Sequence, residues 1–205
     1  MYVVRTLTHP DEIIASQRLR ADICAGEGGY LTRDHVLPDG TERDQYDERC
    51  VHAGVFGPGG ALVGTVRLIS AADDELPIAR HYGVRTSVQD LEVSRLVVHP
   101  EHRRSLVVLA LFHWVVWESL DRDTRNLFAV LERPLLDNLR TVGFPFVELG
   151  EPKCVYRNIL DLPVACEASR LLPGVRRADS GREWKLYDFF GRRFHDGLVP
   201  NSTAG

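Results

Sequence analysis

The sequence lacks the paired cysteines on which most zinc-binding and redox motifs depend. Its 205 residues include four cysteines, and no two of them form a CxxC pair: Cys24, Cys50, Cys154 and Cys166. Cysteines spaced in this way are typical of free thiols in a reducing compartment. We therefore expect a cytoplasmic protein and no metal site.

Long hydrophobic runs are also missing. The first residues, MYVVRTLTHPDEII, contain no apolar stretch of the kind that a signal peptide carries. The longest apolar run covers residues 106–117 and is interrupted by His113. A run of this length is too short to cross a bilayer and is typical of a buried helix. We expect no stable insertion into a membrane.

The chain has no strong excess of charge of either sign. Its formal net charge is -4, with 44% hydrophobic and 26% charged residues. This composition is that of an ordinary globular protein and includes no predominantly basic character, so no nucleic acid partner is expected. The length suffices for one compact domain with a real core.

Short strands and helices alternate along the chain. After residue 91 each strand–helix–strand unit should pair in parallel, and the order of elements predicts an α/β (α+β) fold with a central mixed, twisted sheet flanked by helices. We expect one domain over residues 1–175 and a C-terminal extension over 176–205. The expected elements are a strand at 2–8, a helix from His9-Pro10-Asp11, a hairpin around the Gly-Pro-Gly-Gly turn at 57–60, a strand at 91–98, a helix at about 103–121, a strand at 127–131, a helix after Pro134 that ends at Gly143, and a strand near 146–149, with loops at 30–50 and 71–90.

Charged residues occur inside two apolar runs. Arg67 lies in VGTVRLI, and Glu92 and Arg95 lie in LEVSRLVV. A buried guanidinium must be paired with a carboxylate, and Asp44 and Asp47 in the loop ERDQYDER offer candidates beside Glu92. The resulting network is either structural or the wall of a polar pocket, and the acidic loop by itself could equally be a solvated turn. In a regular strand Glu92 and Arg95 face opposite sides, unless a bulge intervenes.

The segment VHPEHRR follows this strand and leads into the next expected helix. His102, Arg103 and Arg104 add positive charge where the start of a helix would offer free backbone N–H groups. The segment is therefore either a phosphate-binding position or a basic surface turn.

Three motifs in order, D-x-Y-D at 44–47, G-T-x-R-L at 64–68 and E-x-S-R at 92–95, resemble those of one group of enzymes. The sequence over roughly residues 15–160 is similar to acyl-homoserine-lactone (autoinducer) synthases, long-chain N-acyl amino acid synthases and exosortase-associated acyltransferases. This group belongs to the GNAT superfamily, so the resemblance implies a GNAT-like acyltransferase fold.

The resemblance implies that an amine attacks a fatty acyl thioester and forms an amide. Asp44, Asp47, Arg67, Glu92 and Arg95 match the signature residues of the group, and Arg20 matches an arginine of the first helix. Glu92 is the candidate base, acting through water, and backbone N–H groups near Val97 are candidates to stabilise the oxyanion. The expected catalytic residues are Glu92, Arg95 and Asp47. The expected substrate-binding residues are Arg20, Asp44, Arg67, Val97, Arg103 and Arg104.

Two departures from the group bear on the substrates. The turn HRRSLVVLAL has no glycine where many GNAT enzymes cradle coenzyme A, which favours acyl carrier protein over coenzyme A as the donor's carrier. Ile23 and Tyr30 stand where lactone synthases carry aromatic residues around S-adenosylmethionine. We expect no permanently bound cofactor, an acyl carrier protein partner, and an amino acid or S-adenosylmethionine as the acceptor. The alternatives are a non-catalytic acyl-binding or sensor protein and a conventional coenzyme A-dependent N-acetyltransferase.

Overall fold

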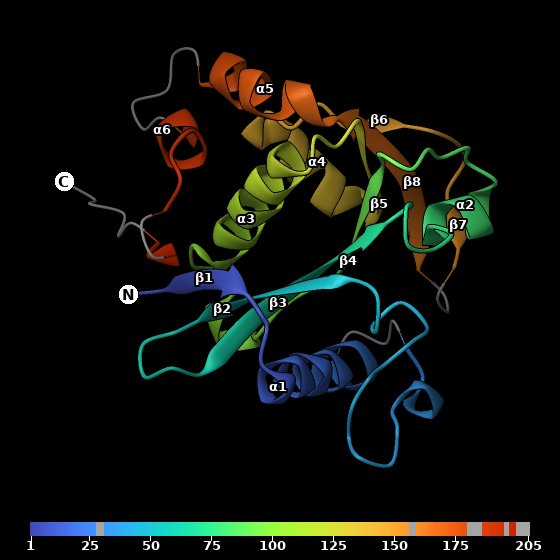
Figure 1. Cartoon of the computed structure of the whole chain (residues 1–205), viewed down its shortest axis with the longest axis vertical. Helices are drawn as coiled ribbons and strands as arrows, with labels where there is room; N and C mark the ends of the chain where they lie inside the picture. The colour runs from blue at the N-terminus through green and yellow to red at the C-terminus, as the bar shows by residue number, and fades with distance from the viewer. Residues whose placement is uncertain (28–30, 156–158, 180–185, 195–196, 200–205) are drawn as a thin grey trace. The chain divides into compact units, whose positions relative to one another are not determined.

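A computed structural model describes residues 1–27, 31–155, 159–179, 186–194 and 197–199 (Figure 1). The chain groups into two compact units. Unit 1 comprises Met1–Arg67, Arg95–Trp114 and Arg193–Gly205, and unit 2 comprises Leu68–Ser94 and Val115–Arg192. The chain passes from one unit to the other within two strands and one helix, β3 (Leu62–Ser70), β4 (Leu91–Val98) and α3 (Val107–Asp121). Among the described residues no helix is long and apolar enough to cross a membrane.

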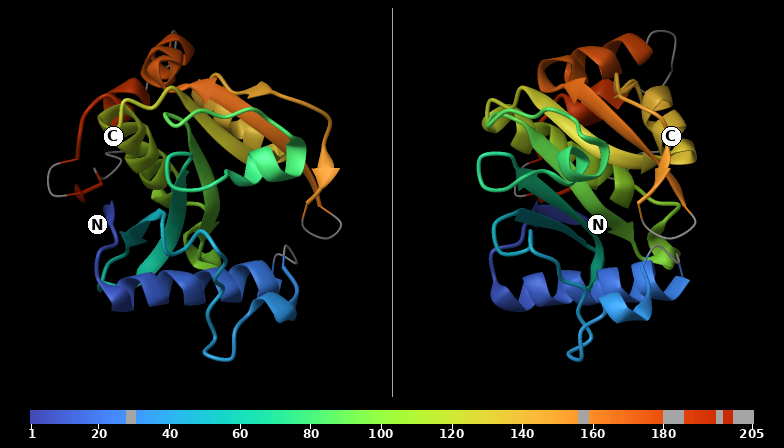
Figure 2. Two further views of the ribbon diagram at one scale, coloured as in Figure 1. Left: turned by 45° about the vertical axis from the view of Figure 1, so that its right-hand side comes forward. Right: turned by 90° about the vertical axis from the view of Figure 1, so that its right-hand side faces the viewer.

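Unit 1 contains the N-terminal strand, a hairpin and the first helix. Strand β1 (Val3–Thr6) pairs antiparallel with β2 (Val51–Phe56), and β2 is followed across the sheet by β3 and then β4. The Gly-Pro-Gly-Gly turn closes the β2–β3 hairpin as expected, with Gly59 and Gly60 at positive φ. In both views of Figure 2 helix α1 (Pro10–Arg20), in blue, lies alongside these strands.

Helix α1 begins with proline in its first turn, where the missing N–H costs nothing, and with two acidic residues that suit the helix dipole. After Arg20 the chain continues without a break into a π-helix, η1 (Ala21–Glu27). The sequence predicts that the helix fades at Gly26, Gly28 and Gly29, whereas the α-helix ends at Arg20 and the π-helix includes Gly26. Gly28 and Gly29 lie outside the described residues. The wider π turn was not expected from the sequence.

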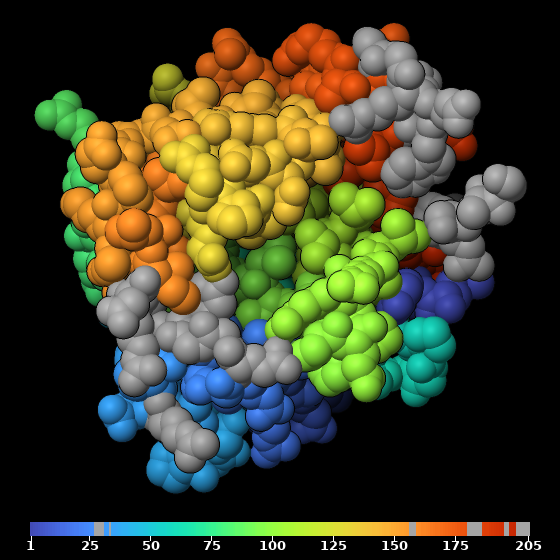
Figure 3. Space-filling model, turned by 180° about the vertical axis from the view of Figure 1, so that it is seen from behind, coloured from blue at the N-terminus to red at the C-terminus, as the bar shows by residue number. Residues whose placement is uncertain are grey.

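Unit 2 contains the other half of the strands. Strand β4 pairs in parallel with β5 (Asn126–Glu132), and β5 pairs antiparallel with β8 (Leu160–Glu167) over its whole length. Two short strands, β6 (Val147–Glu148) and β7 (Lys153–Cys154), pair antiparallel with β8. The helices are α2 (Pro77–Tyr82), α4 (Arg133–Val142), α5 (Leu171–Ala178) and α6 (Leu186–Phe190). Helix α4, in yellow in Figure 3, buries Leu136 and Leu139 and presents its other face at the surface of unit 2.

The expected mixed sheet with flanking helices is confirmed, and strand 91–98 has the predicted bounds. Three expectations were wrong in detail. The loop at 71–90 contains α2, which starts at Pro77 and ends at Gly83 in the left-handed conformation. Helix α3 begins at Val107 rather than 103, after a 3₁₀ turn over Pro100–His102. Strand β6 pairs with β8 and not in parallel with β5, because β8 occupies that edge.

The α4–β6 connection generates a testable prediction about Gly143. Gly143 ends α4 with φ of +108°, and a Cβ atom there would lie 2.7 Å from the Gly174 carbonyl oxygen and 2.8 Å from Val175 Cα. Both the backbone conformation and the contact oppose a side chain. We expect Gly143→Ala to lower the free energy of unfolding by about 3 kcal/mol in urea titrations.

Gly26→Ala is the matched control, because a Cβ atom at Gly26 would meet nothing within 4 Å. Equal stability of the two variants would contradict the close packing of α4 against α5.

Candidate functional site

Strand β4 changes its conformation at the last residue of the motif E-x-S-R. Its parallel ladder with β5 covers Leu91–Val93, and two residues later Arg95 adopts φ of +51°. A left-handed conformation at a residue with a side chain costs about 1–3 kcal/mol and persists where the surroundings hold it. The sequence left two alternatives open: the two charges serve different faces of the strand, or a bulge brings them together. The strand is irregular at Arg95, and Glu92 and Arg95 contact different groups, Ile78 for Glu92 and Glu42 and Asp44 for Arg95.

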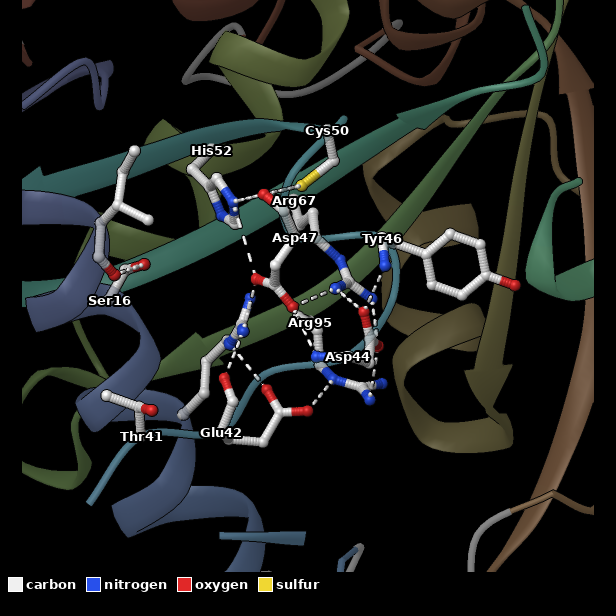
Figure 4. A network of polar contacts seen from close by, with 12 residues as sticks. Ser16, Thr41, Glu42, Asp44, Tyr46, Asp47, Cys50, His52, Arg67 and Arg95 are labelled. Carbon is white, nitrogen blue, oxygen red and sulfur yellow. Dashed lines mark hydrogen bonds and ion pairs between the residues drawn. The ribbon is translucent and has the colours of Figure 1, made fainter. Parts of the chain in front are cut away.

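Arg95 belongs to a set of three arginines and three carboxylates in unit 1, and two of these carboxylates contact it. Each carboxylate bridges two arginines, so the six side chains form a closed ring of alternating charge, which we call the ion-pair ring. Figure 4 shows the three carboxylates together with Arg67 and Arg95. The ring contains Arg20, Glu42, Arg95, Asp44, Arg67 and Asp47, in this order.

The contacts in the ring are short. Arg67 forms a fork on Asp44, from Nη1 to Oδ1 at 2.6 Å and from Nη2 to Oδ2 at 2.9 Å, and its Nη1 also donates to Asp47 Oδ2 at 2.9 Å. Arg20 Nη2 donates to the other oxygen of Asp47 at 2.7 Å. Two-point contacts of this kind are the strongest geometry that an arginine makes with a carboxylate.

Glu42 completes the ring between the remaining arginines. Its Oε2 lies 2.8 Å from Arg20 Nε, and its Oε1 accepts from Arg95 Nε at 3.0 Å. Arg95 Nη2 then donates to Asp44 Oδ2 at 3.2 Å. The ring therefore connects the last residue of α1, the loop at 42–47, strand β3 and strand β4.

Four of the six side chains in the ring are almost completely buried. The side chains of Arg20, Glu42, Asp47 and Arg67 are 1–4% exposed. Asp44 is 26% exposed and Arg95 13% exposed. A ligand in solution can therefore reach the ring at the edge formed by Asp44 and Arg95.

The charges of the ring shift the pKa of two of its members, Asp44 and Arg67. Burial alone would raise the pKa of the Asp44 carboxyl, but hydrogen bonds from Arg67 and the charges of Arg67 and Arg95 hold that pKa well below its ordinary value. Burial would lower the pKa of Arg67, and its bonds to Asp44 raise it instead. Both groups are therefore charged at neutral pH.

His52 and Cys50 lie against Asp47 at the buried side of the ring (Figure 4). His52 Nε2 is 3.1 Å from Cys50 Sγ and 3.2 Å from the Asp47 carbonyl oxygen. Burial lowers the pKa of His52, so the imidazole is neutral, and burial raises the pKa of the Cys50 thiol to about 12. Cys50 is therefore a protonated thiol and a poor nucleophile.

Glu92 lies in unit 2 and has a different environment. Its side chain is buried, and its Oε2 accepts a hydrogen bond of 2.8 Å from the backbone N–H of Ile78, the second residue of α2. A carboxylate at this place satisfies a donor in the first turn of the helix. The carboxylate thus has a structural contact in addition to the catalytic role expected for it.

The remaining expected site residues lie around the end of β4. Val97 is a buried residue of that strand. Arg103 and Arg104 are exposed in the turn between the 3₁₀ segment and α3, and Arg103 Nε donates to the Val98 carbonyl oxygen at 3.3 Å. The two arginines therefore precede α3 and do not belong to its first turn, where Ser105 accepts from the N–H of Val107 instead.

The structure thus brings five predicted residues together in the ring, Arg20, Asp44, Asp47, Arg67 and Arg95. Sequence reasoning missed Glu42, although it lies in the same acidic run as Asp44 and Asp47. Its signal was present, since three arginines in apolar or helical surroundings require three acidic partners. Tyr30 stands where lactone synthases carry an aromatic residue around S-adenosylmethionine, and it lies outside the described residues.

The ring generates a prediction about Asp47. Asp47→Asn removes the negative charge that Arg20 and Arg67 share and leaves both buried guanidinium groups incompletely compensated. We expect the free energy of unfolding, measured by urea titration, to fall by about 3 kcal/mol. Arg43→Ala is the control, because its pair with Asp39 is about half exposed, and such pairs contribute less than about 1 kcal/mol. Similar losses in the two variants would show that the ring is not a stabilising unit.

The depressed pKa of Asp44 generates a prediction about acid stability. A carboxyl whose folded pKa lies below its unfolded value of about 3.9 contributes stability above that value. The contribution is lost as the pH falls from about 5 toward the folded pKa. We expect stability to drop over this range in thermal melts, and Asp44→Asn to show a shallower drop. An identical pH profile for the variant would mean that Asp44 is not held ionised by the ring.

Part of the chain matches a known protein family. Residues 19–113 match the family model described as an acetyltransferase (GNAT) domain. No curated protein sequence matches the chain.

Several solved structures share the fold. The coenzyme A-dependent acyl-homoserine lactone synthase BjaI superposes with a TM-score of 0.74 at 21% identity, covering 88% of this chain and 89% of BjaI. FeeM, an N-acyl amino acid synthase from uncultured soil microbes, superposes with a TM-score of 0.70 at 18% identity, covering 88% of this chain and 98% of FeeM. The lactone synthase LasI superposes with a TM-score of 0.69 at 15% identity, covering 82% of this chain and 90% of LasI. The chain therefore has a GNAT fold, similar to the structures of acyl-homoserine lactone synthases and of an N-acyl amino acid synthase.

Proposed function

We propose that the protein is a cytoplasmic N-acyltransferase that moves a fatty acyl group from a thioester to the amine of a small acceptor. The observation that carries the proposal is the ion-pair ring. Residues from the three motifs D-x-Y-D, G-T-x-R-L and E-x-S-R meet in this ring on a GNAT fold, and the ring is open at Asp44 and Arg95.

The reaction needs no covalent intermediate on the protein. The amine nitrogen attacks the thioester carbonyl carbon, the carbon–sulfur bond breaks, and the thiol leaves as the amide forms. Two thiols, Cys24 and Cys50, are protonated at neutral pH, because burial raises the pKa of Cys24 to about 11 and that of Cys50 to about 12. A protonated thiol does not compete with the acceptor amine for the acyl group.

The acceptor amine must lose a proton to react. Glu92 is the proposed base, through a water molecule. Backbone N–H groups near Val97 are proposed to stabilise the negative charge on the tetrahedral oxygen. The exposed edge of the ring offers both signs of charge, Arg95 for a carboxylate and Asp44 for an ammonium group, which suits an amino acid or S-adenosylmethionine as the acceptor.

The donor is proposed to be an acyl group on acyl carrier protein, with Arg103 and Arg104 as an exposed basic pair for an acidic surface or a phosphate. BjaI is described as coenzyme A-dependent, and one of its structures contains S-adenosylmethionine and isopentyl-coenzyme A. Coenzyme A is thus the alternative donor, and the assay must include both carriers.

One observation favours a second function. Glu92 is engaged by Ile78 and the ring saturates its own charges, as a purely structural network would. A non-catalytic acyl-binding or sensor protein would have the same contacts.

Thiol release separates these functions. Purified full-length protein is offered acyl thioesters of acyl carrier protein and of coenzyme A, each with S-adenosylmethionine or single amino acids, and products are identified by mass spectrometry. Acceptor-dependent release with an N-acyl product supports the proposal and identifies the acceptor. Acyl binding without release from either carrier favours the sensor function.

Glu92→Gln and Arg95→Ala form a matched pair. Glutamine keeps an oxygen for the N–H of Ile78 but cannot take a proton, so turnover should fall by about 10²–10⁴-fold with little change in melting temperature. Arg95→Ala removes one member of the ring and should lower both turnover and melting temperature. Equal loss of stability in the two variants would contradict this division of roles.

A further inference from the structure

A second cluster of polar side chains in unit 1 lies outside the ion-pair ring. His99, Glu101 and His102 follow strand β4, and each offers one ligand atom such that the three atoms lie within 4.8 Å of one another. The 3₁₀ turn over Pro100–His102 brings the three side chains together. Groups with this spacing are candidates to hold one ion.

The ring of His102 is oriented by a residue distant in sequence. Its Nδ1 is 3.0 Å from the hydroxyl of Tyr2, and the two rings meet edge to face. When Nδ1 is engaged in this way, Nε2 is left to bind a metal ion. Histidines that bind metals in proteins almost always make such a contact through the second nitrogen.

His99 contributes an unsatisfied nitrogen. Within the part of the chain that the structure describes, its Nδ1 is closed off from solvent and has no hydrogen-bond partner. Its ring lies 5.9 Å from that of His102, at an interplanar angle of 63°. A buried nitrogen without a partner is unfavourable, and a ligand at this cluster is the simplest explanation for tolerating it.

Another group in unit 1, Asp47, Cys50 and His52, also has metal-ligand spacing. A cation is disfavoured there, since the Asp47 carboxylate is occupied by Arg20 and Arg67 and the Cys50 thiol holds its proton. Two guanidinium groups beside the position add repulsion. The two groups can therefore be told apart by the presence or absence of sulfur among the ligands.

We propose that His99, Glu101 and His102 bind a divalent transition-metal ion, with Zn²⁺ as the first choice and water in the remaining position. Two imidazoles and one carboxylate are a common zinc set, and imidazole also suits Co²⁺ and Ni²⁺. The ion would hold the segment between β4 and α3 in one conformation, directly before Arg103 and Arg104. The proposal does not depend on the acyltransferase function.

The test uses the full-length protein after treatment with a chelator. Zn²⁺ is titrated by calorimetry, and Co²⁺ is added separately and followed by visible absorption. The variants are Glu101→Gln and His102→Ala for the ligands, Tyr2→Phe for the orienting hydroxyl, and Cys50→Ser for the other cluster. His9→Ala, an exposed histidine in the same unit, is the matched control.

We expect one equivalent of Zn²⁺ to bind to the wild type, to Cys50→Ser and to His9→Ala with similar affinity. The ligand variants should bind at least about tenfold more weakly, and Tyr2→Phe about 10–100-fold more weakly. Glu101 is exposed, so Glu101→Gln tests the site even if His102→Ala does not fold. Unchanged affinity in Glu101→Gln, absence of binding to the wild type, or a sulfur-to-cobalt charge-transfer band that Cys50→Ser abolishes would overturn the proposal.

Discussion

The structure of unit 1 depends on alternation of charge around the ion-pair ring. Each of the three guanidinium groups and three carboxylates has two neighbours of opposite sign, so the ring is neutral although nearly all of it is buried. Removing six charges from water costs several kcal/mol per ion, and mutual attraction must offset that cost. Removal of one member leaves an uncompensated buried charge, so the members depend on one another. The ring defines how α1, the loop at 42–47, β3 and β4 meet.

The ring explains two local features that would otherwise be unfavourable. Arg95 has a left-handed backbone, and its guanidinium is tied to Glu42 and Asp44, so the strained conformation is held by contacts at the end of its own side chain. The loop at 42–47 is folded by the same carboxylates, since the N–H of Asp44 donates to Asp47 and the N–H of Tyr46 donates to Asp44. The acidic side chains are thus oriented by contacts within their own loop as well as by the arginines, and such supporting contacts favour one geometry of a site.

The sequence predicted what depends on local pattern and on unpaired charge. Strand β4 was predictable because most of its residues are β-branched or apolar. Pairing of Arg67 and Arg95 with carboxylates of the acidic loop followed from the cost of an isolated buried charge. Glu42 was not distinguished from Glu48 nearby, because a choice between two acidic residues in one loop depends on the path of the backbone. Helix α2 has only 6 residues, which is too few for a periodic pattern to indicate a helix. The insertion of β8 beside β5 is a long-range pairing with no local signal.

The closed form of the ring has a consequence for how this protein can change over evolutionary time. Every member contacts two others, so the effect of a substitution depends on which residues occupy the neighbouring positions, and effects at the six positions do not add. A path that replaces one residue at a time must pass through a chain with an uncompensated buried charge. The six positions therefore form one unit of epistasis. Variation without such a barrier is confined to the exposed parts of the loop, such as Arg43 and Asp39, whose pairing is with each other.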